Sequence, residues 1–192
     1  MKYLYLMRHG ETLFNQLHKI QGWCDSPLTE AGKAQALQAK HYLTQHNITF
    51  DHYFSSTQER ACDTLELITD QPYSRRKNLK EMNFGSFEGE STRLQPVGPE
   101  NYEHFYEQFG GESAEEVRQR MRKELTSIMK ETQENALVVS HNGAIFYFLQ
   151  QFYPLSQQPL QLANCGYIKF AYHEEGFTYI ETINPSTERK SN

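Results

Sequence analysis

Short apolar runs along the chain alternate with longer amphipathic segments. Residues 2–7 (KYLYLM) and 136–140 (ALVVS) are nearly continuous apolar runs, as expected of strands that are buried on both faces. Residues 51–56 (DHYFSS) predict another strand, and residues 73–79 (YSRRKNL) predict an exposed edge strand. Towards the C-terminus, GYIKFAYH and GFTYIETI flank residues 174–176 (EEG) and predict a β-hairpin.

Helices are predicted between these strands. Residues 29–46 begin with Thr29, a typical N-cap, and carry an apolar stripe. Residues 57–69 follow the strand at 51–56 and have helical periodicity. A serine at position 113 and a glutamate three residues later form a capping-box pattern that opens a helix to about residue 132. The apolar segment HNGAIFYFLQQF, which follows the strand at 136–140, predicts a further helix.

The alternation of strands and helices predicts an α/β fold. We expect a three-layer α/β/α sandwich with a mostly parallel sheet and an antiparallel edge. The 192 residues fit a single domain, residues 1–192, with a lid-like insertion at about 88–112. Within this insertion, the aromatic residues of segment 102–109 recur at the spacing of one helix face, which predicts a short helix.

Charge and cysteine content narrow the range of partners. The formal net charge of −5 argues against nucleic acid or an anionic membrane as the main partner. Cys24, Cys62 and Cys165 are far apart and form no CxxC motif, so neither a disulfide framework nor a thiolate metal site is expected. No segment approaches the ~20 apolar residues of a membrane span. These features predict a cytoplasmic protein, and they allow a homodimer.

Two of the predicted strands end on a histidine. LYLMRHG ends at His9, LVVSHNG ends at His141, and each histidine is closely followed by a glycine. In α/β folds, ligands bind beyond the carboxyl ends of the strands, so both imidazoles are expected at one site. Arg8 precedes His9, and Arg60 follows the strand at 51–56 at the same end of the sheet. Because arginine matches two phosphate oxygens with a planar fork of donors, this constellation predicts an anion site.

Other chemistries fit the sequence less well. There is no HExxH, no HxH and no carboxylate cluster beside either histidine, and Arg8 would repel a divalent cation, so no metal site is expected. A GxSxG nucleophile elbow and a phosphate-binding P-loop motif are also absent from the sequence.

Phosphoryl chemistry assigns a role to each group. A neutral His9 could attack phosphorus; the arginines favour its neutral form, whereas a bound phosphate favours the charged form. His141 would donate hydrogen bonds to the equatorial oxygens. A general acid is needed for the leaving alkoxide, and Glu81 lies in a glycine-containing loop that could supply it. Glu88 and Glu90 compete for this role, although Glu88 could instead fix the loop.

Six ordered blocks identify a family resemblance. RHGETLFN, QGWCDSPLTEAGKAQA, SSTQERACDT, KEMNFGSFEG, GGESAEEVRQR and VVSHNG are similar, in order and spacing, to the histidine phosphatase superfamily, over roughly residues 3–145. This family contains cofactor-dependent phosphoglycerate mutases and related phosphatases. The resemblance implies that His9 is the phosphorylated nucleophile, that Glu81 is the acid and base, and that neither metal nor organic cofactor is required. The positions that it assigns to phosphate or substrate are Arg8, Thr12, Asn15, Gln21, Gly22, Arg60, His141, Asn142 and Gly143.

The resemblance leaves three activities open. Phosphoglycerate mutases are similar to one another in a longer insertion with paired arginines and a lysine, whereas here Arg93 is the only arginine or lysine in residues 91–113. The sequence therefore favours a phosphomonoester hydrolase that acts on small phosphorylated metabolites. A mutase is the first alternative. A non-catalytic phospho-ligand binding module is the second, but such a module should lack the nucleophile or the acid, and His9 and Glu81 fill both positions.

Overall fold

A six-stranded mixed sheet forms the centre of the computed structural model, which describes residues 1–154, 158 and 160–186. The strand order is β3-β2-β4-β1-β5-β6. Strands β3, β2, β4 and β1 run parallel to one another, whereas β5 pairs antiparallel with both β1 and β6. The bounds are β1 Lys2–Arg8, β2 His52–Ser56, β3 Ser74–Arg76, β4 Asn135–Ser140, β5 Tyr167–His173 and β6 Gly176–Ile183. The predicted mostly parallel sheet with an antiparallel hairpin edge is confirmed.

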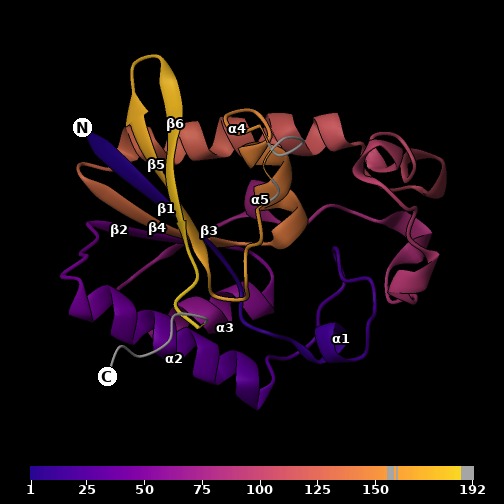
Figure 1. The fold of residues 1–192 in the computed structure, drawn as a ribbon, viewed down its shortest axis with the longest axis horizontal. Coiled ribbons are helices and arrows are strands. Elements are labelled where there is room, and N and C mark those ends of the chain that lie inside the picture. Colours follow the sequence, from indigo (N-terminus) through magenta and orange to yellow (C-terminus); the bar gives the residue numbers. More distant parts are fainter. Residues whose placement is uncertain (155–157, 159, 187–192) are drawn as a thin grey trace.

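Helices cover both faces of this sheet. Helices α2 (Glu30–Gln45) and α3 (Glu59–Ile68) lie on one face, and α4 (Ala114–Glu131) and α5 (Asn142–Leu149) lie on the other (Figure 1). The structure confirms the α/β/α sandwich. None of the helices in the described ranges is both long enough and apolar enough to cross a membrane.

The alternation of side chains along β1 builds the two halves of the core. Leu4 and Leu6 pack with the buried residues of α4 and α5, whereas Tyr5 and Met7 pack with those of α2 and α3. All four residues are buried, which explains why the strand is apolar on both faces. Full burial of each leucine stabilises the fold by about 1.5–3 kcal/mol.

The predicted helix starts are confirmed at their caps. The Thr29 hydroxyl accepts a hydrogen bond from the Gly32 amide at 3.0 Å at the start of α2. At the start of α4, Ser113 and Glu116 form a reciprocal capping box. The edge strand at 73–79 is shorter than predicted, because a 3₁₀ turn at Lys77–Leu79 follows the three residues of β3.

The predicted helix at 102–109 is wrong. The structure has separate 3₁₀ turns at Pro99–Tyr102 and Glu107–Phe109 instead.

The reason lies in how the aromatic residues pack. Phe105, Tyr106 and Phe109 all contact the ring of Phe87, with centroid distances of 5.5, 5.7 and 4.8 Å. The side chains therefore surround one ring instead of forming a straight stripe along a helix.

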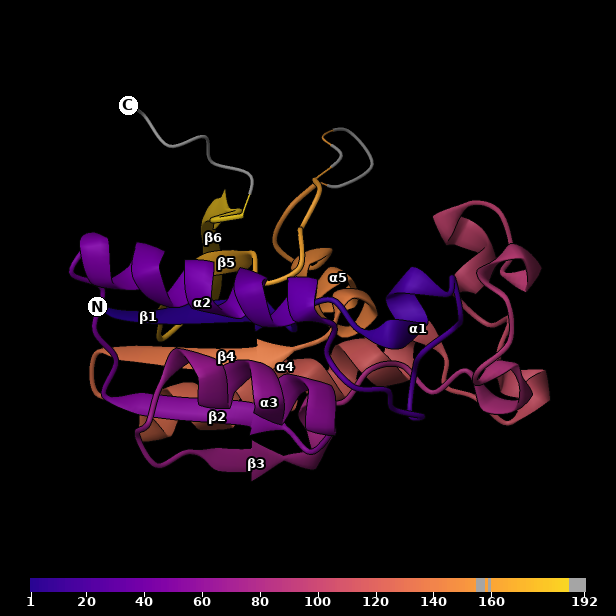
Figure 2. The same ribbon diagram turned by 90° about the horizontal axis from the view of Figure 1, so that it is seen from below.

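The parallel strands point towards a short helix and the insertion. Helix α1 (Leu13–Gln16) and residues 88–112 lie beyond the carboxyl ends of β1, β2 and β4, as Figure 2 shows. Both histidine-bearing strand ends therefore open onto the region that these segments enclose.

Candidate active site

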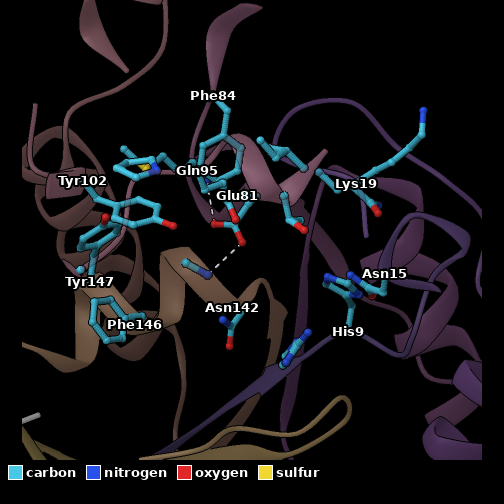
Figure 3. A pocket seen from close by; sticks show the side chains of 18 residues that line it. His9, Asn15, Lys19, Glu81, Phe84, Gln95, Tyr102, Asn142, Phe146 and Tyr147 are labelled. Carbon is cyan, nitrogen blue, oxygen red and sulfur yellow. Dashed lines mark hydrogen bonds between the residues drawn. The ribbon is translucent and has the colours of Figure 1, made fainter. Parts of the chain in front are cut away.

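A cavity of about 490 Å³ lies beyond the carboxyl ends of β1 and β4. Figure 3 shows side chains from distant parts of the sequence converging on it. The predicted site residues that line the cavity are Arg8, His9, Asn15, Gln21, Glu81, Asn142 and Gly143. The predicted site residues Thr12, Gly22, Arg60 and His141 lie in its surroundings and do not line it.

His9 is held in one tautomer at the end of β1. Its Nδ1 lies 2.7 Å from the Gly10 carbonyl oxygen, which can only accept, so Nδ1 carries the proton and Nε2 keeps its lone pair. The backbone is fixed by the Ser140 carbonyl and by the Asn164 side chain. Burial, together with the charges of the two nearby arginines, lowers the pKa of His9 well below its ordinary value. His9 is therefore a neutral imidazole with one free ring nitrogen.

Arg8 places a guanidinium beside His9. One terminal nitrogen donates to the Leu162 carbonyl oxygen at 2.9 Å. The buried Nε has no hydrogen-bond partner among the described residues. Burial lowers the pKa of Arg8, and the charge of Glu81 opposes that shift. Because Arg8 lines the cavity, its guanidinium charge would attract an anion there.

His141 and Arg60 form a buried pair behind His9. The Arg60 Nε donates to Nδ1 of His141 at 3.2 Å, and the His141 Nε2 lies 2.7 Å from the Ser56 hydroxyl. Burial and the Arg60 charge lower the pKa of His141 well below its ordinary value. The rings of His9 and His141 have centroids 5.2 Å apart. The two strand-end histidines are therefore neighbours, as the sequence predicts.

The Arg60 guanidinium faces the loop at residues 21–25. Its terminal nitrogens donate to the Gly22 and Cys24 carbonyl oxygens, each at 2.9 Å, and to the Asp25 carboxylate at 2.8 Å. Arg60 has no exposed surface. The expected contact of Arg60 with phosphate stays a prediction, because each of its three nitrogens donates to the loop or to His141 in this structure.

Glu88 fixes this loop. Its carboxylate accepts hydrogen bonds from the amides of Gly22, Trp23, Cys24 and Phe84, at 2.8–3.0 Å. A carboxylate that accepts four amide hydrogen bonds has its lone pairs occupied. Glu88 therefore anchors the loop, which is the alternative to acid catalysis that the sequence analysis considered for it. Trp23 and Asp25, on the same loop, also hold it: the Trp23 indole donates to the Glu81 carbonyl oxygen at 3.0 Å.

Helix α1 presents Asn15 to the cavity. Thr12 is the buried N-cap of this helix, and the Asn15 Oδ1 accepts from the Thr12 amide at 3.0 Å. The backbone amide of Asn15 donates to the Thr12 hydroxyl at 3.3 Å. The side-chain nitrogen Nδ2 of Asn15 has no partner among the described residues, so a donor remains for a ligand. The Thr12 hydroxyl hydrogen-bonds to the Gln21 side-chain amide group at 2.7 Å, which positions Gln21 at the cavity. Thr12 thus supports two lining residues from behind.

Glu81 brings a carboxylate to the N-terminus of α5. Its oxygens accept from the amides of Met82 and Ala144 at 2.8 Å and of Gly143 at 2.9 Å. A Cβ on Gly143 would lie 2.7 Å from a carboxylate oxygen, so a glycine is needed there. Because its amide is already bonded to Glu81, Gly143 does not offer it to a substrate. Asn142 is exposed and lines the cavity beside Glu81.

Several lining residues were not predicted from the sequence. Lys19 reaches the cavity because its amide bonds to the Phe14 carbonyl oxygen and its backbone bridges to Ser91, which places it after α1. No periodicity or motif in the sequence indicates this position. The other unpredicted lining residues include the aromatic side chains Phe84, Phe146 and Tyr147, which lie beside Tyr102 of the aromatic segment 102–109.

Metal ligands are not grouped in the described residues. No cluster of three or more histidine, cysteine, aspartate or glutamate side chains could hold a metal ion in the ranges that the structure covers.

Comparison with known proteins places the chain in a family. A model of the histidine phosphatase superfamily (branch 1) matches residues 4–184. The chain belongs to this superfamily. A probable phosphoglycerate mutase GpmB of Erwinia tasmaniensis is 35% identical over 184 residues, which cover 86% of this chain and 83% of that protein.

Solved structures of this superfamily share the fold. A phosphoglycerate mutase from Bacillus anthracis is 28% identical with a TM-score of 0.80, and the alignment covers 95% of this chain and 92% of that chain. A phosphoserine phosphatase from Entamoeba histolytica, in complex with 3-phosphoglyceric acid, is 25% identical with a TM-score of 0.79, covering 95% and 96%. The superfamily neighbours thus include both phosphatases and mutases.

Proposed function

We propose that this protein hydrolyses phosphomonoesters of small metabolites through a phosphohistidine on His9. The observation that carries the proposal is one cavity that joins a neutral His9, the Arg8 guanidinium and the Glu81 carboxyl group. A nucleophile with a free lone pair, a cation for the phosphoryl oxygens and a proton-transfer group are what such a reaction requires. Membership of the histidine phosphatase superfamily supports it.

The proposed reaction has two steps. The His9 Nε2 attacks phosphorus, the ester P–O bond breaks, and the protonated Glu81 gives its proton to the departing alkoxide oxygen. A water molecule then attacks the phosphohistidine, Glu81 takes its proton, and the P–N bond breaks to release phosphate and neutral His9. The cations Arg8 and Lys19 line the cavity and would offset the phosphoryl charge, with Asn15 as a neutral donor.

His141 and Arg60 are proposed to support His9. In this structure Arg8 lines the cavity, whereas His141 and Arg60 do not. For Arg60 to donate to a bound phosphate, some of its hydrogen bonds to the loop at residues 21–25 would have to break. In this structure, burial and the charges of Arg60 and Arg8 lower the pKa of His9, which favours the neutral nucleophile.

Hydrolysis is favoured over mutase activity by the charges near the cavity. Arg93 is exposed and does not line it, and the cations among the described lining residues are Arg8 and Lys19. A mutase must hold a substrate with two anionic groups and keep water away from phosphohistidine. The relative named as a probable phosphoglycerate mutase keeps this activity as the second candidate.

The decisive test is to trap the intermediate. The protein is mixed with a ³²P-labelled alkyl phosphate and quenched in base, where phosphohistidine survives. We expect label on wild-type protein and none on His9→Ala, together with a fall in turnover of 4-nitrophenyl phosphate by about 10³-fold or more. His41→Ala, which changes an exposed histidine on α2, is the matched control and should retain both.

The possible outcomes separate the three activities. No turnover by the pure protein, with His9→Ala indistinguishable from wild type and no label on either, would contradict the proposal and favour a binding module. Incubation with 3-phosphoglycerate and trace bisphosphoglycerate tests the mutase: isomerisation faster than release of phosphate would replace hydrolase with mutase.

A further inference from the structure

The end of the cavity away from His9 is lined by aromatic rings. Tyr102, Phe146 and Tyr147, here called the aromatic wall, lie together on the opposite side of the cavity from His9 and Asn15 (Figure 3). Phe146 and Tyr147 make an edge contact with centroids 5.5 Å apart. Tyr147 is buried, and the other two side chains are half-buried. The wall therefore offers aromatic side chains to whatever is attached to the phosphate.

Contacts behind the aromatic wall hold it in place. The Arg118 guanidinium of α4 lies over the Tyr147 ring, 5.4 Å from its centroid. One terminal nitrogen of Arg118 also donates to the Glu103 carboxylate at 2.9 Å, next to Tyr102. Arg118 thus ties the insertion to α5 at the point where both supply wall residues. A preformed surface of this kind costs little to organise when a ligand binds.

None of the charged side chains that line the cavity belongs to the aromatic wall. Among the described lining residues, the charged side chains are Arg8, Lys19 and Glu81. Figure 3 shows Lys19 on the far side of Glu81 from the wall. Arg118, behind Tyr147, is already paired with Glu103. A carboxylate or second phosphate against the wall would therefore lose its hydration without gaining an unpaired cation, which is unfavourable. An uncharged group would lose little and would gain contact with the rings.

The cavity has room for a ring as well as a phosphate. An apolar cavity of about 150 Å³ holds benzene, whereas this cavity measures about 490 Å³. We propose that the alcohol half of the substrate is an uncharged ring system that packs against the aromatic wall. This inference rests on the proposed phosphomonoesterase function and names its substrate class.

The test compares the kcat/KM values with which the purified 192-residue protein hydrolyses three phosphate esters of primary alcohols. The probes are ethyl phosphate, 3-phosphoglycerate and the phenyl-bearing ester 2-phenylethyl phosphate, chosen because each leaves as a primary alkoxide. We expect the phenyl-bearing ester to be hydrolysed with a kcat/KM that exceeds that of each other ester by about 10- to 100-fold. Equal values, or a preference for 3-phosphoglycerate, would overturn the inference while leaving the hydrolase intact. Failure to hydrolyse any ester would instead refute the hydrolase itself.

Variants of the aromatic wall locate the preference. Tyr102→Leu and Phe146→Leu should each lower the preference for the phenyl-bearing ester over ethyl phosphate, measured as the ratio of their kcat/KM values, by about three- to ten-fold, mainly through KM. Phe105→Leu is the matched control, because Phe105 lies in the same segment but packs on Phe87 outside the cavity, and the ratio should not change. If neither wall variant changes the ratio, or if Phe105→Leu changes it equally, the wall is not the binding surface. Thermal unfolding of each variant verifies that it is folded.

Discussion

The Nε of Arg60 donates to Nδ1 of His141, and this contact fixes the protonation of a buried imidazole. Because Nδ1 accepts, the proton of neutral His141 must sit on Nε2, which faces the Ser56 hydroxyl at 2.7 Å. A doubly protonated ring would place an N–H against the Arg60 donor. The structure therefore stabilises neutral His141, in agreement with its lowered pKa. The pKa of His9 beside it is lowered by burial and by the charges of Arg60 and Arg8.

Stability is expected to fall on mild acidification. The unfolded chain protonates each imidazole near the ordinary pKa of 6.5, whereas folded His9 and His141 take up protons only well below it. As the pH falls through this window, the unfolded state binds more protons than the folded state, so the free energy of unfolding decreases. From about pH 7.5 to about pH 5.5, the two histidines should together account for a loss of about 1–3 kcal/mol.

Urea unfolding across that pH range measures the loss, and NMR shows its source. The ring C–H resonances of His9 and His141 should not shift between the two pH values in the folded protein. If both imidazoles titrate in this window, or if acidification increases stability, the predicted linkage is wrong.

Glu81→Gln should slow the hydrolysis of an alkyl phosphate more than that of 4-nitrophenyl phosphate. The substitution removes the group that protonates the alkoxide, so kcat for an alkyl phosphate should fall by about 10²–10⁴-fold. With 4-nitrophenyl phosphate, the rate of phosphoryl transfer to His9 should fall much less, because nitrophenolate leaves without a proton. Burst kinetics measure this first step separately from the hydrolysis of phosphohistidine. Glu90→Gln, an exposed neighbour in the same loop, is the control. Equal losses with both substrates would exclude Glu81 as the acid.

Glu88→Gln should loosen the loop that holds Arg60. The amide group can accept with only one oxygen, and its NH₂ would face amides that need an acceptor. We expect the free energy of unfolding to fall by about 1–3 kcal/mol. Hydrogen exchange should accelerate at the amides of Gly22, Trp23 and Cys24, which donate to Glu88. Unchanged protection at these three amides would show that Glu88 does not anchor the loop.

The sequence predicted the scaffold of the site better than its inner contacts. The apolar runs and caps located β1, β4, α2 and α4, because burial and capping are local properties of the chain. Those elements were sufficient to place His9 and His141 side by side. The segment at 102–109 failed, because its spacing could not show that Phe87, from outside the segment, would gather three of its rings.

The orientation of Arg60 depends on parts of the chain that no short pattern connects. Its partners lie on the loop at residues 21–25, and the path of that loop is set by Glu88, more than sixty residues away in sequence. Lys19 is brought to the cavity in a similar manner, by a bridge to Ser91. Contacts of this kind follow from the folded loops, so a sequence can name the residues without giving their directions.

Asp25→Asn should make the protein less stable and more responsive to phosphate. Arg60 has no exposed surface, and Asp25 is its anionic partner at 2.8 Å, so the substitution leaves a buried guanidinium without a counter-charge. We expect the free energy of unfolding to fall by about 1–3 kcal/mol, less than for a fully buried pair because Asp25 is partly exposed.

Inorganic phosphate that enters beside His9 would restore a counter-charge to Arg60 in Asp25→Asn. It should therefore raise the Tm of Asp25→Asn more than that of wild type. Asp63→Asn, an exposed change on α3, should respond to phosphate like wild type. Equal shifts in all three proteins would mean that Arg60 does not sense an anion in the cavity, and that Arg8 and its neighbours hold the phosphate without it.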